Sequence, residues 1–294
     1  MYLSIRDDIV FAAGYASIAE GLHDLEMNSV ELFVQRDYTV SPLEPIPDKK
    51  RLDLTDPGDF NLLQMQMAEH GIRLCALCMG NNFNAQDKRG EIDWAIGTVR
   101  AAAQLGAPVV RIDPIMSAEK DLPIETRQTI VAEALKEILV RTIDTGVELG
   151  IENHGYQGND PVFLRGLLNK VSSERLGLTL DSGNFYWRGW PLSRVYEIFE
   201  EFAPIVKHTH VKNIAYPPEI REIEREMGFE YDRYVCPIHQ GDIDMNRYVS
   251  QLKKVGYLRD LCLEDESIGK YSIPQRKENL REACKALTIA IETF

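Results

Sequence analysis

Eight short runs rich in β-branched residues or leucine alternate with longer amphipathic segments, and this alternation limits the fold more than any other feature of the chain. The runs occupy residues 2–5, 29–34, 72–77, 107–112, 147–152, 176–181, 206–211 and 260–264. Repeated strand–helix units are typical of a parallel sheet covered by helices. Eight such units in 294 residues predict an α/β fold, a single (β/α)8 barrel domain over residues 1–294.

The segments between the strands show helical periodicity. Helices are predicted over residues 91–105, 123–146, 192–203, 244–255 and 274–292. Gly71, Gly106 and Gly146 precede the next three strands, as expected where a helix ends. No glycine-rich phosphate loop follows the first strand, which disfavours a doubly wound nucleotide-binding sheet. The long connections 35–58 and 213–243 follow strands, so they are expected to wall or cover a site.

Charge and cysteine usage exclude several classes of protein. The formal net charge is −13 with no basic cluster, which disfavours nucleic acid as a partner. The first 20 residues carry no basic leader, and no apolar run reaches the roughly 18 residues of a membrane helix, so a cytoplasmic protein is expected. The five cysteines are then expected to be reduced, with Cys75 and Cys78 packed in the core rather than bound to metal.

Four successive strands end in residue types that ligate metals: Glu152, Asp181, His210 and Glu264. The first three are spaced by 29 residues, about one strand–helix unit, so they are expected at one height at the carboxyl ends of neighbouring strands. Three buried carboxylates side by side are costly without a cation. A divalent metal ion is therefore predicted, with Mn²⁺, Mg²⁺, Co²⁺ and Zn²⁺ all compatible with these ligands.

Strand alternation supports the inward direction of these side chains. Residues two apart share a face, and two positions before each ligand stand small or polar residues, namely Gly150, Thr179, His208 and Cys262. The other parity holds leucine, isoleucine and valine, which suit packing against outer helices. His208 lies about 6.5 Å below His210 along the strand, so it is expected to pack or to support the site rather than to ligate.

The segments "GIENHG", "LTLDSGNF", "KHTHVKN" and "GDIDMNRYVSQLKKVGYLRDLCLEDES" resemble the last four strands of the xylose isomerase-like TIM barrel superfamily, which includes the sugar phosphate isomerase/epimerase family. "VELFV" resembles its second strand, with Glu31 facing inward. The resemblance implies that Glu152, Asp181, His210 and Glu264 bind one divalent metal ion. It also implies that Glu152 and Glu264 act as acid and base around a metal-stabilised enediolate.

Further residues near the strand ends are candidates for contact with substrate, each with packing or a surface position as the alternative. These candidates are His154, Lys212, Arg111, Asn184, His239 and Trp187, with Trp190 as a second aromatic. Asn184 stands where the family often has a histidine. DNA repair is not expected, because "QRDYTV" and "CMGNNFN" lack the additional histidines of the AP endonucleases. The charged run 219–226 is expected to be a solvated helix face.

Three functions remain open. The first is a metal-dependent isomerase or epimerase of a small carbohydrate or polyol ketone. The second is a dehydratase or lyase, either inosose dehydratase-like or acting by β-elimination on a keto-glycoside. The third, a remote alternative, is a non-catalytic sugar-binding barrel. Phosphorylated substrates are disfavoured because no glycine-rich loop opens a helix after the last two strands. Homo-oligomerisation and the identity of the substrate stay open.

Overall fold

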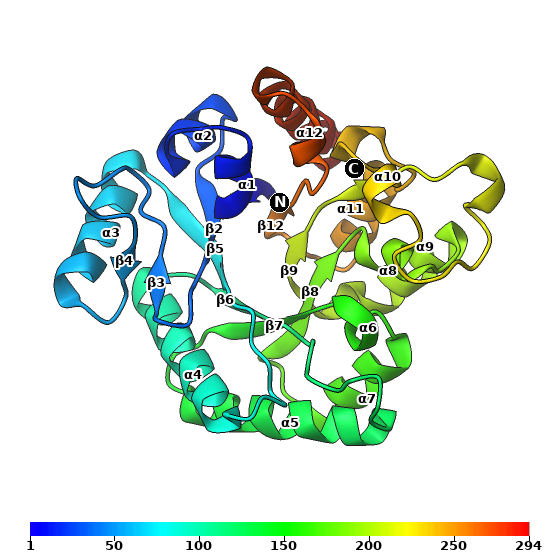
Figure 1. Ribbon diagram of the computed structural model, residues 1–294, viewed down its shortest axis with the longest axis horizontal. Coiled ribbons are helices and arrows are strands. Elements are labelled where there is room, and N and C mark those ends of the chain that lie inside the picture. Colours follow the sequence, from blue (N-terminus) through cyan, green and yellow to red (C-terminus); the bar gives the residue numbers. More distant parts are fainter. Residues whose placement is uncertain (294) are drawn as a thin grey trace.

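Eight parallel strands form a barrel surrounded by helices in the computed structural model, which describes residues 1–293 (Figure 1). The sheet order is β12-β1-β2-β5-β6-β7-β8-β9, and a parallel bridge between Val211 and Leu263 closes it. The predicted (β/α)8 barrel is thereby confirmed. The barrel strands are β1 (Tyr2–Arg6), β2 (Ser29–Phe33), β5 (Arg73–Cys78), β6 (Val109–Ile112), β7 (Glu148–Glu152), β8 (Leu176–Asp181), β9 (Val206–His210) and β12 (Asp260–Leu263).

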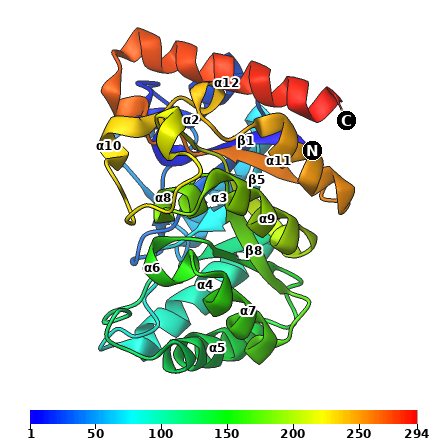
Figure 2. The ribbon, with the colours of Figure 1, turned by 90° about the vertical axis from the view of Figure 1, so that its right-hand side faces the viewer.

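Helices cover the outside of the barrel, while shorter ones lie at its carboxyl end. Figure 2 shows α6, α8 and α10 on the side of the molecule opposite the two termini. No helix within residues 1–293 combines the length and the apolar character needed to cross a membrane. The helices are α1 (Asp7–Ala12), α2 (Ile18–Asp24), α3 (Pro57–His70), α4 (Lys88–Leu105), α5 (Ile124–Arg141), α6 (Gly155–Gly158), α7 (Pro161–Val171), α8 (Asn184–Arg188), α9 (Leu192–Phe202), α10 (Tyr231–Tyr234), α11 (Met245–Lys254) and α12 (Ile273–Thr293).

Helix α5 ends at Arg141, five residues before the predicted end. Its last carbonyls, which have no partner within the helix, are bound by side chains from other elements. Arg175 donates to the carbonyl of Leu139 at 3.0 Å, and Arg100 donates to that of Arg141 at 2.7 Å. Gly146 does adopt a left-handed φ of 70°, but it lies in the turn before β7 rather than at the end of the helix.

The two long connections form small hairpins at the carboxyl end of the barrel. Strands β3 (Thr39–Val40) and β4 (Leu52–Asp53) pair in the first, and β10 (Asn213–Ile214) and β11 (Val235–Cys236) pair in the second. The prediction of a solvated helix face at 219–226 is wrong. The segment forms only a 3-10 turn at Pro218–Ile220, followed by further turns.

Arg225 explains why that charged segment folds without a helix. Its guanidinium lies 4.6 Å from the ring centre of Tyr186 and 4.3 Å from that of Tyr216. It also donates to the backbone carbonyls of Tyr186 and Trp190. Cation–π contacts and these hydrogen bonds hold the connection against α8 in place of helical bonds.

The two faces of the barrel strands separate as predicted. The outward positions of β7, β8 and β12 belong to the continuous apolar core between strands and helices, whereas Gly150, Thr179, His208 and Cys262 do not. A side chain at Gly150 would collide with the Thr179 hydroxyl, so the interior requires a glycine there. Cys75 and Cys78 are buried free thiols.

Candidate metal centre

The four predicted ligands meet at the carboxyl end of the barrel. Glu152, Asp181 and His210 are the last residues of β7, β8 and β9, and Glu264 follows β12. One ligand atom from each lies within 4.8 Å of the ligand atoms of the other three. All four residues are at most 4% exposed. One imidazole nitrogen and three carboxylates are thus close enough together to contact a single metal ion.

Strand tilt, rather than direct pairing of each predicted ligand with the next, brings the four ligands to a common height. Asp181 pairs with His210 in the ladder, but Glu152 pairs with Thr179, two residues before Asp181. Strands of a barrel tilt relative to its axis, so residues further along each next strand come to a common height. The equal spacing of the ligands in the sequence does not by itself predict this offset between neighbouring strands.

Asp181 has one carboxylate oxygen bound by the backbone and the other free of hydrogen bonds. Oδ1 accepts from the amides of Gly183 at 2.8 Å and Asn184 at 2.6 Å, where α8 begins. Oδ2 is buried and accepts no hydrogen bond. Its nearest cation is Lys212, with Nζ at 3.3 Å. Burial raises the pKa of Asp181 to about 6 although Lys212 opposes the shift.

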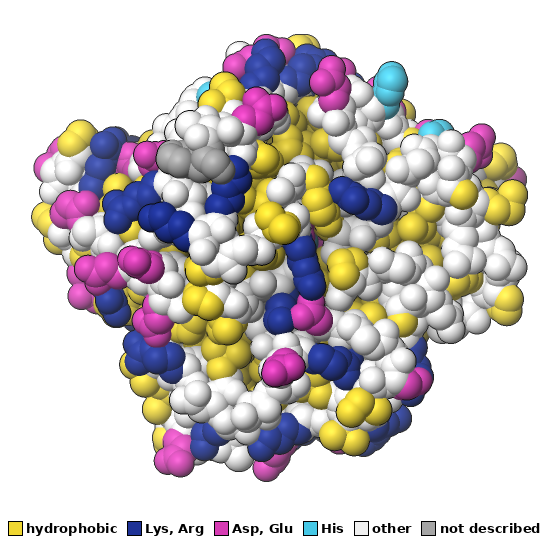
Figure 3. Space-filling model, turned by 180° about the vertical axis from the view of Figure 1, so that it is seen from behind, with side chains coloured by type: hydrophobic (Ala, Val, Ile, Leu, Met, Phe, Trp, Pro, Cys, Tyr) yellow, Lys and Arg dark blue, Asp and Glu magenta, His cyan; other side chains and the backbone are white. Residues whose placement is uncertain are grey.

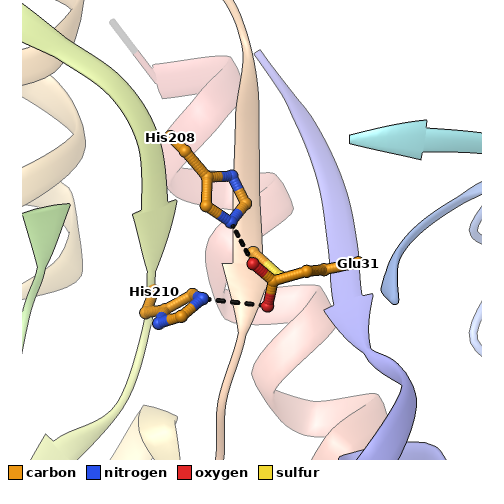
Figure 4. A group of neighbouring side chains, drawn as sticks. Glu31, His208 and His210 are labelled. Atoms are coloured by element: carbon orange, nitrogen blue, oxygen red, sulfur yellow. Dashed lines mark hydrogen bonds and ion pairs between the residues drawn. The ribbon is translucent and has the colours of Figure 1, made fainter. Parts of the chain in front are cut away.

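His210 also presents one bound atom and one free atom. Nε2 lies 3.0 Å from Oε2 of Glu31, as Figure 4 shows. Nδ1 is buried without a hydrogen-bond partner and lies 3.5 Å from a carboxylate oxygen of each glutamate of the cluster, Glu152 and Glu264. The ring nitrogen that faces the cluster is therefore Nδ1.

An arginine from a neighbouring strand pairs with each of the two glutamates. Arg111 at the end of β6 contacts Glu152, and Arg6 at the end of β1 contacts Glu264. Asn184 adds a hydrogen bond to Oε1 of Glu152 at 3.0 Å. Burial favours the protonated form of Glu152, yet the charge of Arg111 lowers its pKa well below the usual value. Arg6 was missed because the predicted first strand stopped at residue 5.

Lys212 closes the cluster on the solvent side. Its ammonium is 3% exposed and lies 3.2 Å from Glu264 and 2.6 Å from Glu266. Burial opposes its charge, but Asp181 and Glu266 raise its pKa above the usual value. The hydroxyl of Tyr231 in α10 donates to Glu266 at 2.5 Å. The connection 213–243 thus reaches the cluster through the contacts of Tyr231 with Glu266 and of Glu266 with Lys212.

The charges and free atoms at this end of the barrel fit a divalent cation. The three cations beside the cluster are shared, because each also pairs with another acid: Arg6 with Asp8, Arg111 with Asp113, and Lys212 with Glu266. Acids therefore outnumber fixed cations, which favours a further positive charge. Asp181 Oδ2 and His210 Nδ1, buried without hydrogen bonds, are atoms that a metal ion would satisfy.

The remaining candidates lie at different places. His154 is 37% exposed at the rim, with Nδ1 3.3 Å from both oxygens of Asp113. Trp187 lines a hollow of about 630 Å³ next to Tyr231. His239 is not brought to the cluster, because its 3-10 turn packs on α12 and its ring contacts Gln240.

Comparison with known proteins identifies the protein family whose sequence pattern the chain matches. A family model described as xylose isomerase-like TIM barrel matches residues 20–289 of the chain. No curated protein matches the chain in sequence. The crystal structure of the IOLI protein with a bound zinc atom superposes with a TM-score of 0.74 at 19% identity, over 100% of this chain and 99% of that one.

Two further solved structures share the fold over nearly full length. An L-ribulose 3-epimerase superposes with a TM-score of 0.68 at 15% identity, over 99% of this chain and 95% of that one. AsbF from Bacillus anthracis, described as a probable 3-DHS dehydratase, superposes with a TM-score of 0.66 at 15% identity, over 98% and 99%. At these identities the likeness establishes the common barrel.

Proposed function

Because the chain belongs to the xylose isomerase-like TIM barrel family, we propose that it is a divalent-metal-dependent isomerase or epimerase of a small carbohydrate or polyol ketone. Glu152, Asp181, His210 and Glu264 would hold the ion, and the two glutamates would also carry protons. The observation that carries the proposal is the meeting of four donor atoms within 4.8 Å, two of which lack hydrogen bonds.

Proton transfer by two carboxylates accounts for both reactions. The ion, when bound, would polarise a substrate carbonyl and stabilise the negative charge that develops on its oxygen. Glu152, kept ionised by Arg111, removes the proton from the carbon next to the carbonyl. Glu264 then returns a proton. Return to the opposite face of the same carbon gives an epimer. Return to the former carbonyl carbon, together with transfer of the α-hydroxyl proton to the former carbonyl oxygen, gives the isomer.

Lys212 and the hollow lined by Trp187 and Tyr231 are two places where the substrate would be recognised. The buried ammonium, already beside Asp181 and Glu264, is placed to donate a hydrogen bond to a substrate oxygen that becomes negative. The hollow next to Trp187 and Tyr231 offers aromatic faces for a sugar ring.

His154 favours β-elimination as a second candidate function. An elimination needs an acid for the leaving oxygen in addition to the base at the α-carbon. Burial disfavours the charged ring of His154, but the hydrogen bond that its ring donates to Asp113 and the charge of Glu152 raise its pKa. The base would take the α-proton, the β-carbon–oxygen bond would break, and His154 would give its proton to the departing hydroxyl or alkoxide.

A metal assay followed by product analysis tests both candidates. The purified protein is analysed for bound metals and then incubated in deuterated water with a panel of aldoses, ketoses and keto-inositols. Isomers and epimers keep the substrate's mass apart from solvent deuterium, whereas elimination loses water or an alcohol. Sugar binding without turnover or deuterium uptake, unchanged in Glu152→Gln and Glu264→Gln, would instead favour the non-catalytic sugar-binding barrel.

A further inference from the structure

A row of three buried side chains leads across the barrel interior to His210. Asp260 Oδ2 lies 2.7 Å from Nδ1 of His208, and Nε2 of His208 lies 3.0 Å from Oε1 of Glu31. The other oxygen of Glu31 lies 3.0 Å from Nε2 of His210 (Figure 4). All four residues are at most 1% exposed. Glu31 therefore joins two histidines of β9 from the opposite strand β2.

This row determines which nitrogen of His210 faces the cluster. An ionised carboxylate can only accept hydrogen bonds, so Nε2 of His210 carries the hydrogen that Glu31 receives. The lone pair of the neutral ring then resides on Nδ1, which lies 3.5 Å from Glu152 and from Glu264. Rotation of the ring by half a turn would break the contact with Glu31 inside a dry interior, where an unpaired polar atom is costly.

The far end of the row is itself anchored. Asp260 Oδ1 accepts from the hydroxyl of Tyr257 at 3.2 Å, and Oδ2 faces the backbone amide of Thr209 at 3.3 Å. Both nitrogens of His208 lie beside carboxylates, with Nε2 3.0 Å from Glu31 and Nδ1 2.7 Å from Asp260. His208 thus holds the carboxylate of Glu31 in the plane in which its second oxygen meets His210.

We propose that Asp260, His208 and Glu31 are positioning residues that present Nδ1 of His210 to the metal ion. The proposal rests on the proposed function in one respect, namely that an ion binds at the cluster. Supporting partners of this kind orient a ligating histidine and raise its affinity for metal. His208 then serves the centre without touching the ion, and the sequence repeat His-x-His encodes one ligand and one support.

Zinc affinity of variants tests the proposal. Glu31→Gln leaves one oxygen for two imidazoles, and His208→Gln cannot reach Glu31 and Asp260 together. Competition with a chromophoric chelator should show zinc binding weakened by about 10–100-fold in each. Cys262→Ala is the matched control, because its thiol forms with Glu31, His208 and His210 a second group of potential metal ligands, and weakened zinc binding in this variant would place the ion there and overturn the proposal. It should bind zinc as the wild type does.

A measurement on the wild type removes the dependence on folded variants. In zinc-loaded protein with ¹⁵N-labelled histidine, long-range proton–nitrogen spectra should show Nδ1 of His210 bound to zinc and Nε2 protonated. Ligation through Nε2, a second zinc ion held by His208, or unchanged affinity in folded Glu31→Gln and His208→Gln would overturn the proposal.

The outcomes separate this inference from the proposed enzymatic function. Zinc bound through Nδ1, with weakened binding in the variants but no turnover of any substrate, would support the positioning role and contradict the enzyme. A wild type that binds no divalent ion would overturn both.

Discussion

The two ends of the barrel use the same charged residue types in opposite ways. At the amino end, Lys207 and Arg259 both pair with Glu148, at 2.6 Å and 2.5 Å, and all three side chains retain contact with water. Figure 3 shows basic and acidic side chains side by side at the centre of this face. At the carboxyl end the acids are buried, they share their cations, and Asp181 Oδ2 and His210 Nδ1 accept no hydrogen bond.

This difference distinguishes ion pairs that stabilise the fold from acidic side chains that we expect to bind a metal ion. The partly exposed pairs at the amino end satisfy each other, and their loss should cost little. Buried acids like those at the carboxyl end are expensive for the fold, and we expect a further cation to balance them. The contrast matches the general division of such barrels, in which chemistry resides at the carboxyl end and stability at the amino end.

The largest expected difference between the two ends is in turnover. Glu152→Gln and Glu264→Gln should each reduce turnover and deuterium uptake by about 10²–10⁴-fold, because each removes one proton carrier. Glu148→Gln is the control at the amino end and should keep the wild-type rate. Exchange rates measured by proton NMR in deuterated water would decide this, and a wild-type rate in Glu152→Gln would contradict the assigned role.

Metal removal should lower the thermal stability of the protein, and the effect should depend on the cluster at the carboxyl end. With the ion at about 1,000 times its dissociation constant, binding adds about 4 kcal/mol, so chelation should lower Tm by roughly 5–10 °C. Asp181→Asn keeps an oxygen that can accept the hydrogen bonds from the amides of Gly183 and Asn184, but it replaces Oδ2, the predicted metal ligand, with an amide nitrogen. Thermal melts of this variant should be insensitive to chelator. An equal chelator effect in Asp181→Asn would place the ion elsewhere.

Asp7 should make stability depend on pH through the same carboxyl end. The side chain is 3% exposed beside the start of α1, and burial raises its pKa to about 7. The folded state therefore retains a proton that the unfolded chain loses near pH 4, so stability falls as pH rises toward 7. Asp7→Asn should remove roughly 2 kcal/mol of this loss between pH 5 and 8.

Chemical denaturation of the chelated protein across that pH range measures the effect of Asp7. The variant should gain more over the wild type at pH 8 than at pH 5. A gain that is equal at both pH values would show that Asp7 is ionised throughout.

The smallest effect is expected at the amino end. Glu148→Gln removes the shared partner of Lys207 and Arg259, yet these groups are partly exposed, so the loss of unfolding free energy should be about 1 kcal/mol or less. High salt should diminish the difference from the wild type. A loss several times larger, unaffected by salt, would mean that the two ends are less different than the structure indicates.

Particular residues show how far the sequence could predict this site. Glu152, Asp181, His210 and Glu264 could be named because each ends a recognisable strand, and strand alternation directs each one inward. Helix α5 was drawn too long because its end depends on Arg100 and Arg175, which come from other elements. His239 was one of the candidates for contact with substrate, and only the structure shows that its turn packs on α12.

The sequence by itself determined the barrel and the ligand types at its carboxyl end, because period-two and period-3.6 patterns act locally along the chain. Only the tertiary structure decided that Arg6 pairs with Glu264 and Arg111 with Glu152, and that Nδ1 of His210 faces the cluster. Glu31 and His208 are 177 residues apart, so their contact exists only once the barrel has closed. Local patterns place residues on strands, whereas hydrogen bonds across the closed interior set the direction of each functional atom.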